Sequence, residues 1–101
     1  MKKLFISQPM RGKTDEQILT ERENAVEAAK KILGDEVEVI DSFFQNASAE
    51  GKPLWFLGKS LELLSTADAV YFAPGWGMAR GCRIEHDCAV EYGVPIINDR
   101  W

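Results

Sequence analysis

The chain has few cysteines, no excess of basic residues and no long apolar run. Its 101 residues include only two cysteines, and 12 Lys and Arg against 16 Asp and Glu give a net charge of −4. An acidic chain lacks the basic stripe of a general nucleic-acid binder, so we expect no nucleic-acid polymer as partner. No apolar segment approaches the roughly 18 residues of a membrane span, and no signal-peptide core follows the first residues. We therefore expect no membrane partner and a cytoplasmic location.

The two cysteines do not indicate a disulfide or a metal centre. Cys82 and Cys88 are six residues apart in one predicted helix, whose geometry turns them to different sides. Cys82 and His86 are four residues apart, but two ligands do not make a zinc site. We interpret both thiols as small core residues and expect neither a metal nor another cofactor.

The apolar pattern alternates between short strands and helices. Strands are predicted at residues 3–7, 36–41, 69–73 and 94–97. The first helix begins after a capping box of Thr14 and Gln17 and ends at Gly34. Its inner stripe consists of Ile18, Arg22, Ala25, Val26, Ala29, Ile32 and Leu33. A second helix begins at Pro53 and carries the stripe Leu54, Leu57, Leu61 and Leu64, and a third follows residues 74–81.

Strands that alternate with helices predict an α/β fold with a parallel sheet. The simplest winding is a short flavodoxin-like three-layer sandwich of four strands in the order 2-1-3-4, as a single domain over residues 1–101. Ligands bind such sheets beyond the carboxyl ends of the strands. The segments that follow the strands, residues 7–13, 41–42, 74–81 and 98–101, should therefore meet at one edge.

Glu85 is the most informative residue of the third helix. It is the only charged residue on a helical face that otherwise contains Gly81, Cys88, Ala89 and Tyr92. A carboxylate that points inward from a strand-loop-helix unit is a candidate for catalysis. The alternative interpretation is an acid that the helix dipole favours near the helix N-terminus.

Two basic segments lie next to predicted helix starts. Arg11, Gly12 and Lys13 precede the first helix, where free N–H groups favour anions and an arginine can bind a phosphate with two hydrogen bonds. The spacing of a Walker motif is absent, and a solvated loop with two surface cations is the alternative. The second segment is the Gly-rich loop of residues 74–81, which contains Arg80. Its Trp76 either stacks on a base or sugar or anchors the loop to the core.

Residues 5–12 (FISQPMRG), 67–70 (ADAV) and 74–85 resemble a small uncharacterised family of phage and bacterial proteins, the DUF4406-like domains. The resemblance covers nearly the whole chain. This family is related to nucleoside 2-deoxyribosyltransferases and deoxynucleoside 5′-monophosphate N-glycosidases, in which a Glu after the third strand is the nucleophile. Glu85 is the matching residue. The first loop of those enzymes contacts the nucleoside or its phosphate, and Ser7, Gln8, Arg11 and Gly12 lie on this loop.

The resemblance implies a retaining mechanism on a small-molecule nucleoside or nucleotide. Glu85 would attack C1′ of the sugar, and water or a second base would then resolve the glycosyl-enzyme ester. Trp76, Arg80, Gly81 and Arg83 are further expected substrate-binding residues, and the arginines favour a 5′-phosphorylated substrate. We therefore predict N-glycosidic bond cleavage or deoxyribosyl transfer.

The chain departs from the transferases at two positions. They carry an Asp shortly before the nucleophile, where this chain has Ala79, and another Asp in the preceding helix, where it has Lys59 or Ser60. These departures favour an alternative function, a non-catalytic module that binds a nucleotide or another phosphate ligand on the same fold.

We predict that the protein forms a homodimer or a higher homo-oligomer. Trp55 and Phe56 lie roughly 100–200° around the second helix from its leucine stripe, so a monomer would expose a large apolar patch. The alternative is that both rings fold under residues 42–52 of the same subunit. Light scattering at micromolar concentration should give a mass well above the 11.3 kDa of one chain, and Trp55→Glu should lower it. A wild-type mass of one chain would contradict the prediction.

Overall fold

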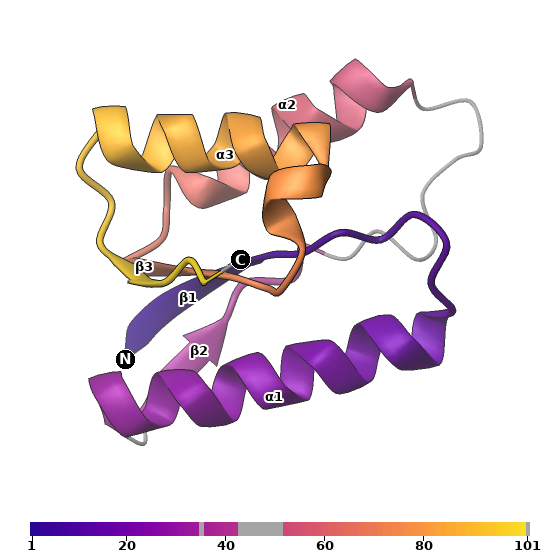
Figure 1. Ribbon diagram of the computed structural model, residues 1–101. Coiled ribbons are helices and arrows are strands. Elements are labelled where there is room, and N and C mark those ends of the chain that lie inside the picture. Colours follow the sequence, from indigo (N-terminus) through magenta and orange to yellow (C-terminus); the bar gives the residue numbers. More distant parts are fainter. Residues whose placement is uncertain (35, 43–51, 101) are drawn as a thin grey trace.

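The computed structural model describes residues 1–34, 36–42 and 52–100, in which strands and helices alternate. The elements are β1 (Lys2–Ser7), α1 (Asp15–Leu33), β2 (Val37–Val39), α2 (Pro53–Leu64), β3 (Ala69–Phe72), the 3-10 helix η1 (Trp76–Met78), α3 (Arg80–Glu91) and β4 (Ile96–Asn98). The strands form one parallel sheet in the order β2-β1-β3-β4, which confirms the predicted class and winding. Helix α1 covers one face of the sheet, and α2 and α3 cover the other (Figure 1).

The alternation of side chains along β1 determines which residues reach each helix layer. Leu4 and Ile6 belong to the core cluster on the α1 side, and Phe5 belongs to the cluster on the side of α2 and α3. Because successive side chains of a strand point to opposite faces, Ser7 continues the row of Phe5. Gln8, which follows the strand, continues the row of Leu4 and Ile6. The adjacent polar residues Ser7 and Gln8 thus face the helix layers on opposite sides of the sheet.

Helix α1 begins with the predicted capping box and packs through most of the predicted stripe. The Gln17 amide nitrogen donates to Thr14 Oγ1 at 3.1 Å, and the Thr14 amide nitrogen donates to Gln17 Oε1 at 2.9 Å. The prediction is wrong for Ile32, which is 60% exposed, because Leu33 lies closer to the row of Ala29 and packs on the core instead. No described helix is both long and apolar enough to cross a membrane.

The beginning of α2 extends past the sheet, at the same end of the molecule as the loop after β1 (Figure 1). The prediction that Leu54 is an inner residue is therefore wrong, since Leu54 is 77% exposed while Leu64 is buried. Trp55 is exposed and meets the half-buried Phe56 edge to face, with ring centroids 5.0 Å apart. Residues 43–51, invoked above as a cover for these rings, lie outside the described residues, so subunit association stays a prediction.

Two of the strands differ from their predicted bounds. Strand β2 covers Val37–Val39 only, although the Ile40 amide nitrogen still donates to the Leu4 carbonyl at 2.9 Å. Strand β4 begins at Ile96 and not at residue 94, because Pro95 has no N–H to donate to the ladder. Strand β3 is buried on both faces except at the half-buried Tyr71, as its continuous apolar sequence predicts.

Candidate functional site

A cavity of about 860 Å³ lies at the carboxyl edge of the sheet, where the winding predicts a site. Its walls come from the end of β1 and the loop after it, from Ser42 after β2, from the first half of α2 and from the start of α3. Seven of the predicted site residues line it: Ser7, Gln8, Arg11, Arg80, Gly81, Arg83 and Glu85. Gly12 and Trp76 are not in the lining, and neither are residues 98–100. Trp101 lies outside the described residues.

Glu85 faces the interior, as the helical spacing predicts, and is only 7% exposed. The buried Ser7 hydroxyl donates to Glu85 Oε1 at 2.7 Å, so the end of β1 and the second turn of α3 hold the carboxylate together. Burial raises the pKa of Glu85 from its usual value of 4.5 to about 7, and the hydrogen bond from Ser7 opposes the rise. The carboxyl group therefore changes its charge near neutral pH, a property common in catalytic acids and bases.

The same helical face was predicted to include Tyr92, and that prediction is wrong. Tyr92 is exposed because it is the C-cap residue, where φ is −103° and ψ is 9° and the helical path ends. Cys88 is half-buried and packs against the core cluster beneath α2 and α3.

Cys82 lies in the cavity wall close to Ser7 and Glu85. Burial raises the pKa of its thiol to about 11, and the nearby carboxylate of Glu85 adds to the rise. The thiol is therefore neutral at physiological pH, which makes it a poor nucleophile and a poor metal ligand. Among the described residues there is no group of three His, Cys, Asp or Glu side chains that could hold a metal ion.

Positive charge is concentrated around the cavity although the chain is acidic overall. Arg11, Arg80 and Arg83 line it, and Glu85 is the one acidic residue of the described lining. Arg83 Nη1 donates to the Gly77 carbonyl at 3.2 Å, whereas Arg11 and Arg80 are exposed and have no hydrogen-bond or ion-pair partner within the described part of the chain.

The start of α3 adds to this positive potential. Ala79, its N-cap residue, supplies no capping side chain. The first backbone N–H groups of α3, which belong to Arg80, Gly81 and Cys82 in the cavity wall, therefore have no capping acceptor. Free N–H groups at a helix start attract anions, as arginine side chains do. This side of the cavity is therefore suited to a phosphate or a carboxylate.

Another part of the cavity wall is apolar. Phe56 and Leu57 come from the first turns of α2, Met10 comes from the loop that follows β1, and Met78 is the last residue of η1. An aromatic ring and flexible thioethers form an adaptable surface for a flat apolar group such as a base. The cavity thus combines a cationic region, an apolar region and one buried carboxylate.

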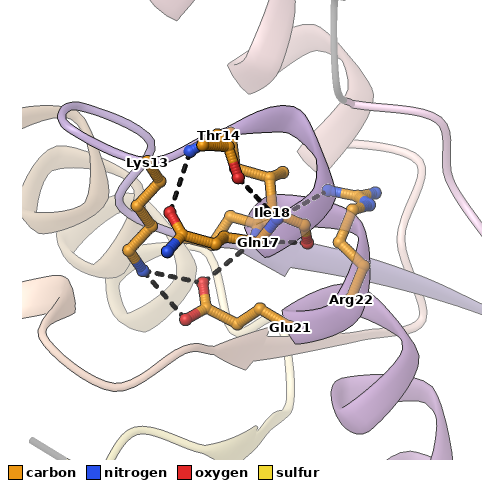
Figure 2. A network of polar contacts seen from close by, with 7 residues as sticks. Lys13, Thr14, Gln17, Ile18, Glu21 and Arg22 are labelled. Carbon is orange, nitrogen blue, oxygen red and sulfur yellow. Dashed lines mark hydrogen bonds and ion pairs between the residues drawn. The ribbon is translucent and has the colours of Figure 1, made fainter.

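A polar network joins Gln8, in the cavity wall, to α1, and Figure 2 shows Ile18, Glu21 and Arg22 of this network. Gln8 Nε2 donates to the Ile18 carbonyl at 3.2 Å and to Glu21 Oε1 at 3.0 Å, and Arg22 Nη1 donates to Gln8 Oε1 at 2.9 Å. Both amide hydrogens of Gln8 are in use. Gln8 therefore acts as a structural residue of the cavity wall in this state of the protein, not as a free donor for a ligand.

Arg22 connects the carboxyl ends of two strands. It is 8% exposed, and its Nη2 donates to the Ile40 carbonyl at 3.0 Å and to Ser42 Oγ at 3.3 Å, beyond the end of β2. Burial lowers the pKa of the guanidinium, while the charge of Asp41 opposes the change. Sequence reasoning placed Arg22 on the buried stripe but gave it no role. The available signal was a cation within an apolar stripe, the same kind of signal that identified Glu85.

Trp76 and Gly12 have structural roles in the described arrangement. Trp76 Nε1 donates to the Asp99 carbonyl at 2.8 Å, and the indole stacks on His86 with centroids 4.3 Å apart. These contacts favour the interpretation of Trp76 as an anchor of its loop. Gly12 has a φ of 81°, a left-handed conformation that glycine adopts readily in a turn.

The parallel sheet with a charged cavity at its carboxyl edge defines the protein as an α/β domain of flavodoxin-like architecture with a candidate small-molecule site. A family model described as "Domain of unknown function (DUF4406)" matches residues 2–98, and the chain belongs to this family. No curated protein and no solved structure matches the chain. The family expected from the sequence is thus confirmed, and the relation to deoxyribosyltransferases stays a prediction.

The raised pKa of Glu85 predicts a stability that falls with pH. Because the folded state binds this proton more tightly than the unfolded state, stability is lost as the pH rises from 4.5 to about 7. Glu85→Gln cannot ionise and should be more stable than wild type at pH 8 by up to about 3 kcal/mol, with no difference below pH 4.5. Urea unfolding at both pH values measures this. Glu91→Gln, at the exposed end of α3, is the control, and an equal effect of both substitutions would contradict the prediction.

Proposed function

We propose that the protein cleaves the N-glycosidic bond of a 5′-phosphorylated nucleoside, or transfers its deoxyribosyl group, with Glu85 as the nucleophile. One observation carries the proposal: a buried carboxylate, bound by Ser7 at 2.7 Å, lies in the wall of a cavity that has both a cationic and an apolar region. The sequence resemblance described above supports the same reaction.

The parts of a nucleotide match the parts of the cavity. The phosphate would bind to Arg11 and Arg80 and to the uncapped start of α3, where charge-assisted hydrogen bonds are available. The base would pack against Phe56 and the neighbouring apolar side chains. The sugar joins base and phosphate, so its anomeric carbon would lie between these regions, within reach of Glu85.

The reaction would proceed in two displacements at C1′. Glu85 Oε1 accepts the hydrogen bond from Ser7, which leaves Oε2 to attack. The Oε2–C1′ bond forms as the C1′–N bond breaks, and the electron pair goes to the base nitrogen, which takes a proton from solvent. Water then attacks C1′, the ester bond breaks, and the carboxylate of Glu85 is restored with release of the water proton. In transfer, the nitrogen of a second base replaces the water.

Ligand binding without catalysis is the second candidate function, and one observation favours it. Ala79 lines the cavity at a position where the resembled transferases have a carboxylate, and Ser60, one of the two residues considered for the second such position, lines it as well. Lys59, the other residue considered for the second position, pairs instead with Glu62 at 3.6 Å and does not line the cavity. If those carboxylates are needed to protonate the base or hold the sugar, the cavity would bind a nucleotide and leave it intact.

We predict that the wild type releases free base from a panel of deoxynucleoside 5′-monophosphates and that Glu85→Gln abolishes the release. Only the ionised carboxylate attacks, so kcat/KM should rise with pH and level off above about 7. Chromatographic detection of free base checks both statements, and Glu91→Gln serves as the control on the same helix. Full turnover by Glu85→Gln would show that Glu85 is structural. Tight binding without base release by wild type would establish the second candidate.

We predict a preference for the monophosphate over the nucleoside, carried mainly by Arg11 with help from Arg80 or Arg83. A charge-assisted contact should contribute about 1.5–3 kcal/mol, or roughly one to two decades in affinity. Calorimetry with a deoxynucleoside and its 5′-monophosphate should show this difference, and Arg11→Ala should remove most of it. Lys31→Ala, an exposed cation in the last turn of α1, is the control for the loss of one positive charge. Equal affinities for the two ligands would mean that the cations of this loop are merely solvated.

A further inference from the structure

Two residues that flank the loop of Arg11 bind the same carboxylate. The loop, residues 9–12, lies between Gln8, which directly follows β1, and Lys13, which precedes the N-cap residue of α1. Gln8 Nε2 lies 3.0 Å from Glu21 Oε1, and Lys13 Nζ lies 3.1 Å from Oε1 and 2.8 Å from Oε2 of the same residue. Figure 2 shows Lys13 and Glu21 facing each other across the start of α1. Glu21 therefore joins both ends of the loop to the body of the helix.

The Gln8 end of the loop is held in one orientation. The Arg22 guanidinium donates to Gln8 Oε1 at 2.9 Å, and Gln8 Nε2 also donates to the Ile18 carbonyl at 3.2 Å. A rotation of the amide would place two donors against Arg22 and an acceptor against Glu21. The amide group therefore has one favourable orientation, and in that orientation it donates to Glu21.

The Lys13 end of the loop is fixed by a backbone hydrogen bond. The Lys13 amide nitrogen donates to the Met10 carbonyl at 3.2 Å, and Gly12 takes the left-handed conformation that this turn requires. Arg11 lies between the two held ends, lines the cavity and has no partner within the described residues. The backbone of the loop is thus fixed at both ends, while the guanidinium of Arg11 remains available to a ligand in the cavity.

The pair of Lys13 and Glu21 differs from the pair of Glu27 and Lys30 on the same helix. The side chains of Lys13 and Glu21 are 28% and 22% exposed, whereas Glu27 is 72% exposed and lies 3.9 Å from Lys30. A shielded pair with short contacts is less screened by solvent and salt than an exposed pair. Glu27 therefore offers a matched control, with the same charge on the same helix and no contact with the loop.

We propose that Glu21 is a positioning residue for Arg11, which it presents to the phosphate of the bound nucleotide by holding both ends of the loop. The inference rests on the proposed nucleotide ligand. A loop that is ordered before binding loses less conformational entropy when the ligand arrives, so the affinity is higher. Glu21 itself does not line the cavity and acts only through the loop.

The sign of the effect separates this role from simple electrostatics. A negative charge near an anion site opposes anion binding, so removal of a carboxylate would strengthen phosphate binding if charge alone mattered. Loss of the positioning contact has the opposite effect. We therefore expect Glu21→Ala to weaken binding of a deoxynucleoside 5′-monophosphate about five- to tenfold and to leave binding of the deoxynucleoside unchanged.

Calorimetry with both ligands on wild type, Glu21→Ala and Glu27→Ala tests this expectation. In the Arg11→Ala background, Glu21→Ala should have no further effect on monophosphate binding, because its action passes through Arg11. Equal or tighter monophosphate binding by Glu21→Ala than by Glu27→Ala would overturn the proposal. An undiminished effect without Arg11, or an equal loss for the nucleoside, would also overturn it.

A measurement on the ligand-free protein separates this proposal from the proposed function. Hydrogen exchange of the Lys13 amide, followed by NMR, should be faster in Glu21→Ala than in Glu27→Ala, because this amide closes the turn to Met10. Unchanged exchange would overturn the positioning role whatever the ligand is. Absence of a monophosphate preference in wild type would instead count against the proposed function. Faster exchange in Glu21→Ala would even then support the conclusion that Glu21 stabilises the loop.

Discussion

The hydrogen bond from Ser7 to Glu85 is the contact on which the candidate site depends. It connects the end of a central strand to the second turn of α3, across the boundary between the sheet and a helix layer. Without this bond the buried carboxylate would have no polar partner among the described residues, and burial of an unpartnered acid is costly. The position of Glu85 in the cavity wall thus follows from the position of β1 at the centre of the sheet.

Consecutive residues of one strand end organise two different polar systems. Ser7 points toward α3 and holds the acid, while Gln8 points toward α1 and belongs to the network of Glu21 and Arg22. One residue of offset along a strand reverses the face that a side chain reaches. A catalytic candidate and the support of its neighbouring loop can therefore lie within two residues of sequence without competing for partners.

The cavity combines an acid whose ionisation is disfavoured by burial with cationic groups that attract an anionic ligand. Burial disfavours the ionised form of Glu85, whereas the arginines and the uncapped start of α3 favour negative charge in a ligand. An acid kept at the expense of stability, next to Arg11 and Arg80, which have no partner among the described residues, is typical of a site retained for function, because stability alone would be better served by apolar side chains. The exposed apolar beginning of α2 borders the same cavity.

Local patterns in the sequence were sufficient to predict the order of the elements, the winding of the sheet, the capping box and the inward direction of Glu85. These features follow from residue spacing and from the geometry of parallel α/β units. The sequence did not reveal the partner of Glu85, the roles of Glu21 and Arg22, or the exposure of Leu54. Each of these depends on which distant segments meet, such as Ser7 with a residue 78 positions further along the chain. Spacing determines the face of an element on which a side chain lies, and only the tertiary structure determines what that face meets.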